Sequence, residues 1–360
     1  MEVYFEFWPY ILMFLTIIFS SYYKSKNGSS IIIFLALFLF SALRFDVGWD
    51  YTEYVGIIKG SVNSILVTRF EPLSKFILYI GAYLEFYPIV FIIFSFFTLY
   101  FVHKSITRYS SNHSISWLVF YCLPLFFLAS LSTIRQSVAI AIVFFSFKYI
   151  YEKKHLKFLI LILISSLLHY SSIVGLLLIF ICKKPFNKIT NTILIFSSFI
   201  LSEFIYNYLE ILLNIDNPNI SRYITFYLDA DLHAPTKLQY VYFSIAALNI
   251  LVYDKLVLFN PINKIFIAIS SFGIFLFNIL SFEPVTASRV SAFFIIFWIF
   301  LIPEYSKLFK SDSKKIVNFT TYSLFIIMFF IYLNIYVTAF ESGYNEKNSF
   351  IPYKSWIFNL

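Results

Sequence analysis

Long apolar runs separated by short polar segments extend along the whole chain. About ten of these runs approach the length of roughly 20 residues that crosses a bilayer as a helix. They occupy residues 4–20, 30–43, 88–102, 116–129, 134–151, 190–211, 238–253, 264–280, 290–302 and 318–338. No apolar–polar alternation with a period of two residues suggests a barrel. The pattern predicts an all-α polytopic membrane protein with about ten full transmembrane helices.

Two further apolar segments do not fit a simple crossing. The segment 71–86 is short and carries three charged residues, so we expect an interfacial or re-entrant helix on the outer face. The segment 158–181 has lysines at both ends and a polar break around His169, which predicts a hairpin of two short helices. Non-helical backbone at membrane depth is tolerated where protein or a water-filled cavity covers it. We therefore expect His169 to line a cavity.

The positions of the lysines assign the two sides of the membrane. Cytoplasmic loops carry an excess of basic residues, so the lysine-rich loops are cytoplasmic. Both termini then lie outside, and so do the loops 44–70, 214–237 and 281–289 and the tail 341–360. We see no linker, repeat or composition change, and expect a single integral membrane domain over 1–360.

The composition excludes a soluble protein and argues against nucleic acid, a metal or a cofactor as the ligand. Hydrophobic residues make up 60% of the chain and charged residues 13%, and the mean hydropathy is +0.81. The net charge of +8 follows from the lysine-rich cytoplasmic loops, so we expect no nucleic-acid partner. Cys122 and Cys182 lie in or beside apolar runs without metal-ligand spacing. We expect no metal and no cofactor.

The arginines are distributed differently from the lysines. Among the six arginines only Arg108 is cytoplasmic in this topology. The others lie on the outer side: Arg44, Arg69, Arg135, Arg222 and Arg289. Lysine is sufficient to signal topology, whereas a guanidinium also binds two phosphate oxygens at once and keeps its proton. The outer arginines therefore either bind an anionic substrate or pair with nearby acids, such as Asp46 or Asp50 for Arg44.

A polar cluster follows directly on the second apolar run. The segment 44–55 contains one arginine, three acids and several aromatic residues, with Gly48 at an expected turn. A membrane helix that ends in such residues delivers them to the water interface. We interpret the segment as one wall of an extracytoplasmic site for a lipid-linked sugar.

Several local motifs, taken in order, resemble the EpsG/Wzy-type polysaccharide polymerases. They are Arg44-x-x-x-Gly48-x-Asp50-Tyr51-x-x-Tyr54, Glu71-Pro72, Ile134-Arg135-Gln136-Ser137, Leu168-His169-Tyr170-Ser171, Arg222-Tyr223, Arg289 before a span that ends in Pro303, and Ile351-Pro352-Tyr353. Each motif is short, but their order and spacing cover nearly the whole chain.

The resemblance implies a reaction and its partners. Such proteins move a growing glycan from undecaprenyl pyrophosphate to the non-reducing end of a new lipid-linked repeat unit. They act on the outer face of the bacterial inner membrane and make O-antigen, capsule or exopolysaccharide. The related ligase fold is a metal-independent C-type glycosyltransferase bundle. The expected partners are the two lipid-linked oligosaccharides, membrane lipid and a chain-length regulator.

Transfer from a lipid pyrophosphate requires stabilisation of the leaving group and removal of the acceptor proton. We expect Arg135 and Arg289 to be the leading pyrophosphate ligands, followed by Arg222 and Arg44. The base is either His169, since imidazole is the most common general base in enzymes, or Asp50.

Five further residues are candidates for substrate contact. We expect Tyr51 and Tyr54 to stack on sugar faces, and Gln136, Glu71 and Tyr353 to contact the substrates. Glu71-Pro72 is also a usual start of a helix, and Tyr353 also suits an anchor at the membrane interface.

Two other classes of protein fit part of the pattern. A flippase or transporter for lipid-linked oligosaccharide would also need a cationic cavity, but it would show inverted repeats and polar residues at both faces. A membrane O-acyltransferase also uses histidine and arginine. The gathering of the polar clusters on one side favours a polymerase.

If the outer arginines bind pyrophosphate through two parallel hydrogen bonds, Arg135→Lys and Arg289→Lys will each shorten the polymer. Lysine keeps the charge but loses the planar fork. The product ladder on a gel measures the effect, and full-length polymer from both variants would contradict two-point binding.

Overall fold

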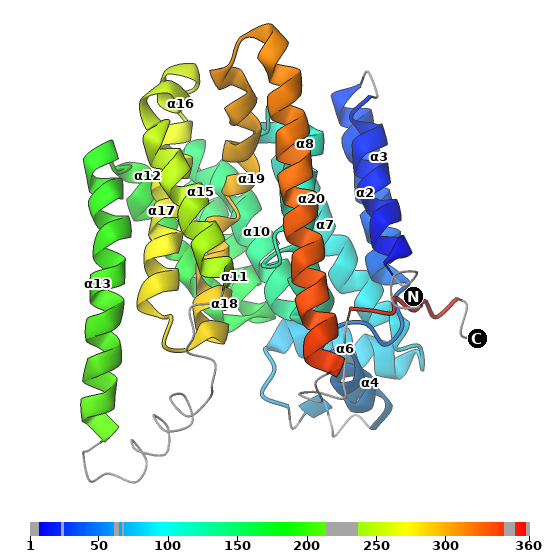
Figure 1. The fold of residues 1–360 in the computed structure, drawn as a ribbon. Coiled ribbons are helices and arrows are strands. Elements are labelled where there is room, and N and C mark those ends of the chain that lie inside the picture. Colours follow the sequence, from blue (N-terminus) through cyan, green and yellow to red (C-terminus); the bar gives the residue numbers. More distant parts are fainter. Residues whose placement is uncertain are drawn as a thin grey trace. The chain divides into compact units, whose positions relative to one another are not determined.

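The structure, a computed structural model, describes residues 7–22, 25–60, 65–66, 68–213, 237–341 and 350–357. Helices account for most of these residues (Figure 1). Within the described ranges the sole strand-like pairing is an isolated antiparallel bridge between Arg44 and Ser355. The predicted all-α class is thereby confirmed for the described part of the chain. The candidate Arg222 lies outside the described residues.

Four described helices are long and apolar enough to cross a membrane. They are α7 (Pro88–Tyr109), α10 (Ile134–Tyr151), α13 (Lys188–Leu213) and α20 (Ser311–Glu341). Two bent pairs bring the number to six if each pair is one span. These pairs are α15 (Lys237–Leu251) with α16 (Tyr253–Phe259), and α18 (Pro284–Ile295) with the segment that begins with α19 (Trp298–Leu301).

Several expected crossings are shorter than the bilayer is thick. These apolar helices are α2 (Trp8–Ser20), α3 (Lys26–Ala42) and α17 (Asn263–Ile279). The predicted hairpin 158–181 also consists of short apolar helices, α11 (His155–Leu168) and the 3₁₀ helix η1 (Tyr170–Leu176) that continues into α12 (Leu177–Lys183). At 1.5 Å per residue, even the 17-residue α3 is only about 25 Å long, against a hydrocarbon core of roughly 30 Å. The expected count of about ten full spans is therefore not confirmed.

Proline divides one of the predicted spans. The run 116–129 forms two helices, α8 (His113–Cys122) and α9 (Phe127–Ser132). Leu123 between them is extended, with φ −73° and ψ 120°, because the residue before a proline disfavours helical backbone and Pro124 follows. The remaining short elements of the chain are α4 (Tyr51–Gly60), α6 (Pro72–Tyr83) and the 3₁₀ helix η3 (Ile302–Leu308). The segment 71–86, predicted as an interfacial helix, contains α6, which is not among the candidate spans.

Packing groups the chain into two compact units. Unit 1 consists of residues 1–175 and 302–360, and unit 2 of residues 176–301. In unit 1, α10 packs between α7 and α11, and α7 also packs on α3. In unit 2, α17 packs on α13 and α18. The expectation of a single membrane domain stays a prediction.

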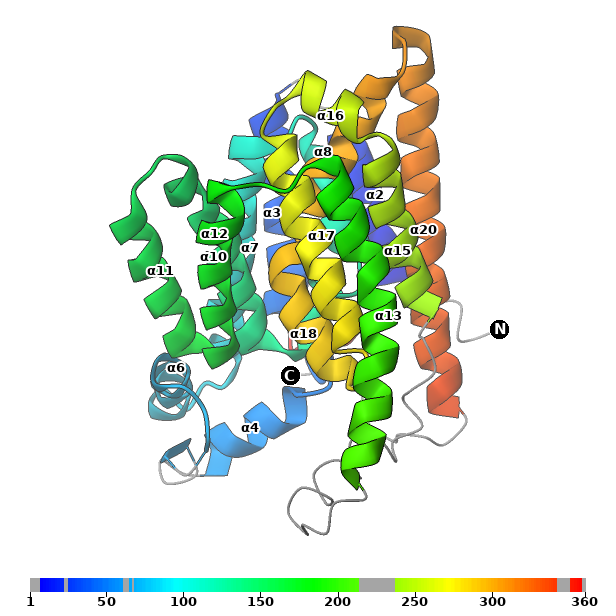
Figure 2. The same cartoon turned by 90° about the vertical axis from the view of Figure 1, so that its left-hand side faces the viewer.

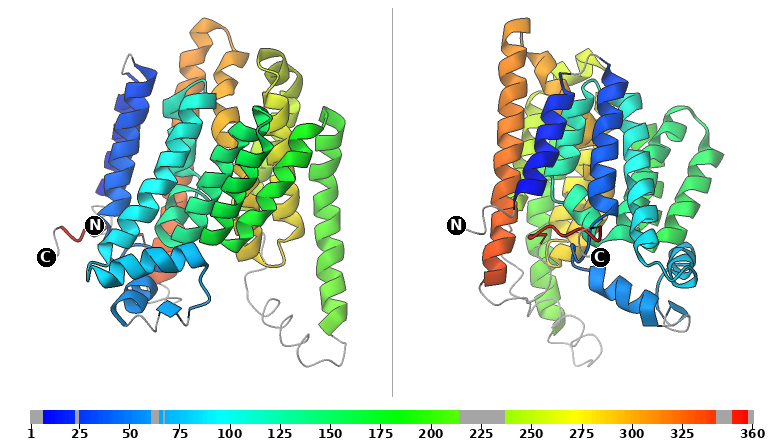
Figure 3. Two further views of the ribbon diagram at one scale, coloured as in Figure 1. Left: turned by 180° about the vertical axis from the view of Figure 1, so that it is seen from behind. Right: turned by 90° about the vertical axis from the view of Figure 1, so that its right-hand side faces the viewer.

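Unit 1 has two chemically different ends. At one end the turn after α10 is basic, and Arg108 at the end of α7 forms an ion pair with Glu152, with 2.5 Å between Nη2 and Oε1. At the other end α4 and α6 lie near the first residues of α10 and the last residues of α11 (Figures 2 and 3). Helix α10 has 18 residues and separates the two ends by about 27 Å.

A glycine fixes the position of the segment 44–55 at this second end. Gly48 has φ +100°, and a Cβ atom there would lie 2.0 Å from the carbonyl oxygen of Leu131. The next residue, Trp49, donates its backbone N–H to Ser132 Oγ at 3.0 Å. Gly48 and Trp49 therefore pack against the last residues of α9, directly before α10, and only glycine fits at position 48.

Gly48→Ala should destabilise the protein by about 1–3 kcal/mol, because alanine strains the backbone and meets the Leu131 carbonyl. The apparent melting temperature in detergent measures the loss. Gly56→Ala is the matched control, since nothing lies within 4 Å of a Cβ there and alanine favours the helix. A Gly48→Ala protein as stable as Gly56→Ala would contradict the argument.

Candidate active site

Glu71 stands at the start of α6 but does not cap it. Pro72 occupies the first turn, where its fixed φ suits a helix, and the Glu71 carboxylate makes no hydrogen bond to the N–H groups of α6. The same dipeptide behaves differently at the start of α18. There the Glu283 carboxylate accepts hydrogen bonds from the backbone N–H groups of Val285 and Thr286. The Glu71 carboxylate is therefore available to other segments.

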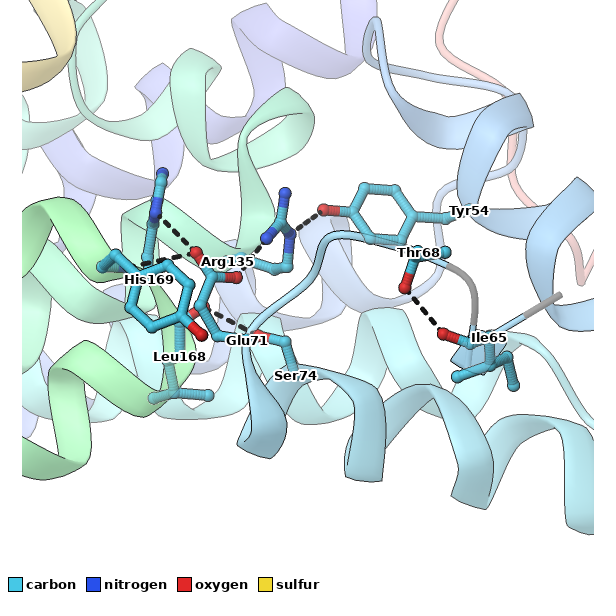
Figure 4. A network of polar contacts seen from close by, with 9 residues as sticks. Tyr54, Ile65, Thr68, Glu71, Ser74, Arg135, Leu168 and His169 are labelled. Atoms are coloured by element: carbon cyan, nitrogen blue, oxygen red, sulfur yellow. Dashed lines mark hydrogen bonds and ion pairs between the residues drawn. The ribbon is translucent and has the colours of Figure 1, made fainter. Parts of the chain in front are cut away.

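That carboxylate binds donors from two other parts of unit 1 (Figure 4). Its Oε2 forms an ion pair with Nη1 of Arg135, in the first turn of α10. Its Oε1 lies 3.0 Å from Nδ1 of His169 and accepts the backbone N–H of Tyr170 at 3.1 Å. Only 4% of the Glu71 side chain is exposed. A buried carboxylate thus joins α6, α10 and the segment after α11.

Hydrogen bonds from α6 stabilise the break in the helix at His169, between α11 and η1. His169 is extended, with φ −156° and ψ 118°, and ends α11. Ser74 on α6 donates its hydroxyl to the carbonyl of Leu168 at 2.8 Å, which satisfies one of the acceptors that a helix end leaves unpaired. The hydrogen bond from Tyr170 to Glu71 fixes the other side of the break.

The chain reverses direction after His169. A Cβ atom at Gly175 in η1 would lie 3.0 Å from Ile162 of α11 and 2.8 Å from Val143 of α10. A residue 13 positions further along a straight helix would lie about 20 Å away, so η1 returns alongside α11. This is the turn that the lysines flanking 158–181 predicted. The cavity expected beside His169 stays a prediction.

Arg135 is fixed on several sides and open on one. Its Nε donates to the hydroxyl of Tyr54 at 2.8 Å, and its Cζ lies 3.7 Å from the centre of the Phe70 ring. Its Nη1 binds Glu71. Within the described residues Nη2 makes no hydrogen bond, and 19% of the side chain is exposed. The guanidinium can therefore donate a hydrogen bond to one further anionic oxygen without losing its present partners.

The electrostatics keep Glu71 ionised. Glu71 lies outside the candidate spans, where burial alone would raise the pKa of its carboxyl. The hydrogen bonds from His169 and from backbone N–H groups and the charge of Arg135 outweigh burial, and they lower this pKa to about 2. An ionised carboxylate accepts hydrogen bonds and donates none.

Arg44 is buried rather than open to a ligand. Only 1% of the residue is exposed, and its Nε donates to the Val47 carbonyl at 3.2 Å. Its Nη1 lies 3.3 Å from Ser41 Oγ and 3.4 Å from Ser95 Oγ, and its Cζ lies 4.8 Å from the centre of the Phe91 ring. The Arg44 hydrogen bonds go to carbonyl and hydroxyl groups and not to Asp46, which the sequence suggested.

The C-terminal residues 350–357 pair with the chain around Arg44. Phe45 donates its N–H to the Lys354 carbonyl at 2.8 Å, and Trp356 donates to the Leu43 carbonyl at 3.0 Å. The Lys354 ammonium lies 3.9 Å from an Asp46 oxygen. Pyrophosphate binding by Arg44 stays a prediction, and it would require these contacts to open.

The candidates for sugar contact lie largely inside unit 1. Tyr51 and Tyr54 are each 3% exposed and Gln136 is 2% exposed. The Tyr51 ring stacks on Phe91 with 4.4 Å between ring centres. Asp50 is half-buried directly before α4, and its carbonyl accepts the N–H of Tyr54 at 3.0 Å. The sugar-binding roles of these residues stay predictions.

Two other candidates have different surroundings. The Tyr353 ring stacks on Phe40 of α3 with 4.1 Å between centres, and its hydroxyl donates to the Phe40 carbonyl at 2.7 Å. Substrate contact and membrane anchoring by Tyr353 both stay predictions. Arg289 is exposed on α18 in unit 2, where the Glu283 carboxylate caps the helix.

The structure therefore brings together Arg135, His169, Glu71 and Tyr54. Sequence reasoning singled out all four but did not find that Glu71 joins them. One signal was available, because a charge in an apolar region is costly to bury without partners. The partners themselves lie 64 and 98 residues further along the chain.

The chain is thus a helical membrane protein in which an arginine and a histidine bind one buried carboxylate. The profile of the EpsG family matches residues 28–355, and the chain belongs to the EpsG family. That family is one of polysaccharide-polymerase-type membrane proteins with glycosyltransferase-like activity. No curated protein and no solved structure shows a significant match.

Tyr54→Phe should lower the unfolding free energy by about 1–3 kcal/mol, because it removes a hydrogen-bond partner from a charged group. A lower apparent melting temperature in detergent is the expected readout. Tyr79→Phe is the control, since Tyr79 is an exposed tyrosine on α6. Equal melting temperatures for the two variants would show that the Tyr54 hydroxyl contributes nothing to Arg135.

Proposed function

We propose that the protein is a polysaccharide polymerase. It transfers a growing glycan from undecaprenyl pyrophosphate to the non-reducing end of a lipid-linked repeat unit. The observation that carries the proposal is the meeting of Arg135 and His169 on one carboxylate in an EpsG-family chain. The acceptor hydroxyl that loses its proton and the pyrophosphate that departs react at the same anomeric carbon, so the base and the leaving-group ligand must lie close together. A histidine and an arginine suit these two tasks.

In the reaction, a hydroxyl oxygen of the acceptor sugar attacks the anomeric carbon of the donor glycan. The bond from that carbon to the pyrophosphate oxygen breaks, and its electron pair stays on the pyrophosphate. The guanidinium of Arg135 stabilises the departing anion through charge-assisted hydrogen bonds. The hydroxyl proton passes to His169, which later releases it to water.

His169 is the better candidate for the base than Asp50. It shares Glu71 with Arg135, so the base and the leaving-group ligand are held at the same place. Asp50 lies beside Tyr54, whose hydroxyl binds Arg135, and remains the alternative. Arg289 and Arg222 are further candidates for the pyrophosphate, since it carries more charge than one arginine neutralises.

The site is proposed to face the outside of the bacterial inner membrane. In unit 1 the lysine-rich turn after α10 lies at the opposite end from His169, as the positive-inside bias requires of a cytoplasmic turn. In this orientation both termini lie outside. The shorter apolar helices complete the count of about ten crossings, in places where flanking residues or a locally thinner bilayer make up the length.

Arg135→Ala and His169→Ala should each reduce polymerisation on the order of 100-fold or more. Purified protein supplied with a defined lipid-linked repeat unit gives the readout, as dimers and longer products on a gel. Arg108→Ala is the control, because Arg108 lies at the other end of unit 1 in an ion pair with Glu152.

A deletion strain separates the proposal from the alternatives. A polymerase deletion leaves single repeats and no ladder. Intermediates trapped on the inner leaflet would instead identify a flippase, and a full ladder that lacks an acyl group would identify an acyltransferase. Either of these last two results overturns the proposed function.

A further inference from the structure

We propose that Glu71 is a positioning residue that prepares both His169 and Arg135 for the reaction. It holds His169 with the proton on Nδ1, so that Nε2 carries the lone pair that accepts the substrate proton. It holds Arg135 through Nη1, so that Nη2 remains for the pyrophosphate. This inference rests on the proposed function and goes beyond it, since the sequence predicted only substrate contact or a helix start for Glu71.

The Glu71 carboxylate is not needed to begin its own helix. Glu283 precedes a proline in the same way and uses its carboxylate to cap α18. Glu71 leaves the N–H groups of α6 uncapped and turns its carboxylate to α10 and the break after α11. An acid at this helix position usually caps the helix, whereas Glu71 contacts the two candidate catalytic side chains instead.

Glu71 also fixes the tautomer of His169. The Glu71 carboxylate is ionised and only accepts hydrogen bonds, so the imidazole nitrogen 3.0 Å away must carry the proton. A neutral imidazole then has its lone pair on Nε2, which makes no hydrogen bond within the described residues. When Nε2 takes the acceptor proton, the resulting imidazolium is stabilised by the same carboxylate.

Glu71 and its neighbours leave one nitrogen of Arg135 open. Nε and Nη1 are occupied by Tyr54 and Glu71, and one face of the guanidinium lies on the Phe70 ring. Nη2 is the nitrogen without a partner in the described part of the chain. In Figure 4, His169 and Arg135 flank Glu71, and the ends of both side chains point away from its carboxylate toward the same side. One substrate can therefore reach both open nitrogens.

No other cation of α6 competes for this carboxylate. Lys75, one turn along the helix, donates its ammonium to the Leu66 carbonyl at 2.9 Å. The donors that contact the Glu71 carboxylate from neighbouring elements are Arg135, His169 and the N–H of Tyr170. Their arrangement distinguishes Glu71 from an acid that merely balances a nearby charge.

The test compares Glu71→Ala with Glu71→Gln in the full-length protein supplied with a defined lipid-linked repeat unit. Both variants should lose activity on the order of 100-fold. Formate should restore a measurable part of the activity of Glu71→Ala, because a small carboxylate fits the vacated space. It should not restore Glu71→Gln, whose amide fills that space without the charge. Asp254→Ala, which removes an exposed acid on α16 in unit 2, is the control.

A double variant shows whether Glu71 acts through His169. Adding Glu71→Ala to His169→Ala should cost less than Glu71→Ala costs alone, since one of the two residues that Glu71 positions is already gone. A purely structural role predicts multiplied losses and no rescue by formate in Glu71→Ala. Those results, or full activity of Glu71→Gln in a protein that melts normally, overturn the inference. If the wild-type protein extends no repeat unit, the proposed function itself fails.

Discussion

The structure of unit 1 depends on one buried carboxylate in apolar surroundings. An ionised acid removed from water is costly unless cations and hydrogen-bond donors surround it. Glu71 obtains these partners from the start of α10 and from the break after α11. Three segments far apart in the chain must therefore meet at one point, and they bring Arg135 and His169 together.

The same constraint explains why the helix can break at His169. A helix end leaves carbonyl and N–H groups unpaired, and water is scarce near a membrane. The Ser74 hydroxyl donates to the Leu168 carbonyl, and the Glu71 carboxylate accepts the Tyr170 N–H. Both side chains lie at the start of α6. The short helix thus supplies the polar partners that the bilayer cannot, and the irregular backbone turns an imidazole toward Glu71.

Arg44 and Arg135 are both predicted to lie on the outer side, but they differ in burial and in their partners. Arg44 is enclosed by hydroxyls, carbonyls and an aromatic ring, and the C-terminal residues pair with its neighbours. It stabilises the end of α3 and the attachment of the tail. Arg135 keeps Nη2 open within the described residues and is partly exposed. Burial, rather than charge, separates a structural arginine from a candidate ligand.

The sequence by itself determined the class of fold, because apolar runs of bilayer length allow little but helices. It also predicted the turn at Gly48, the break at His169 and the family, since these depend on local backbone needs and short motifs. It could not determine how many runs form full crossings, because Pro124 and early helix ends shorten several of them. Nor could it assign different functions to Glu71 and Glu283, which both precede a proline. Only the tertiary structure decided that difference, because the partners of Glu71 lie 64 and 98 residues away and no local pattern encodes such contacts.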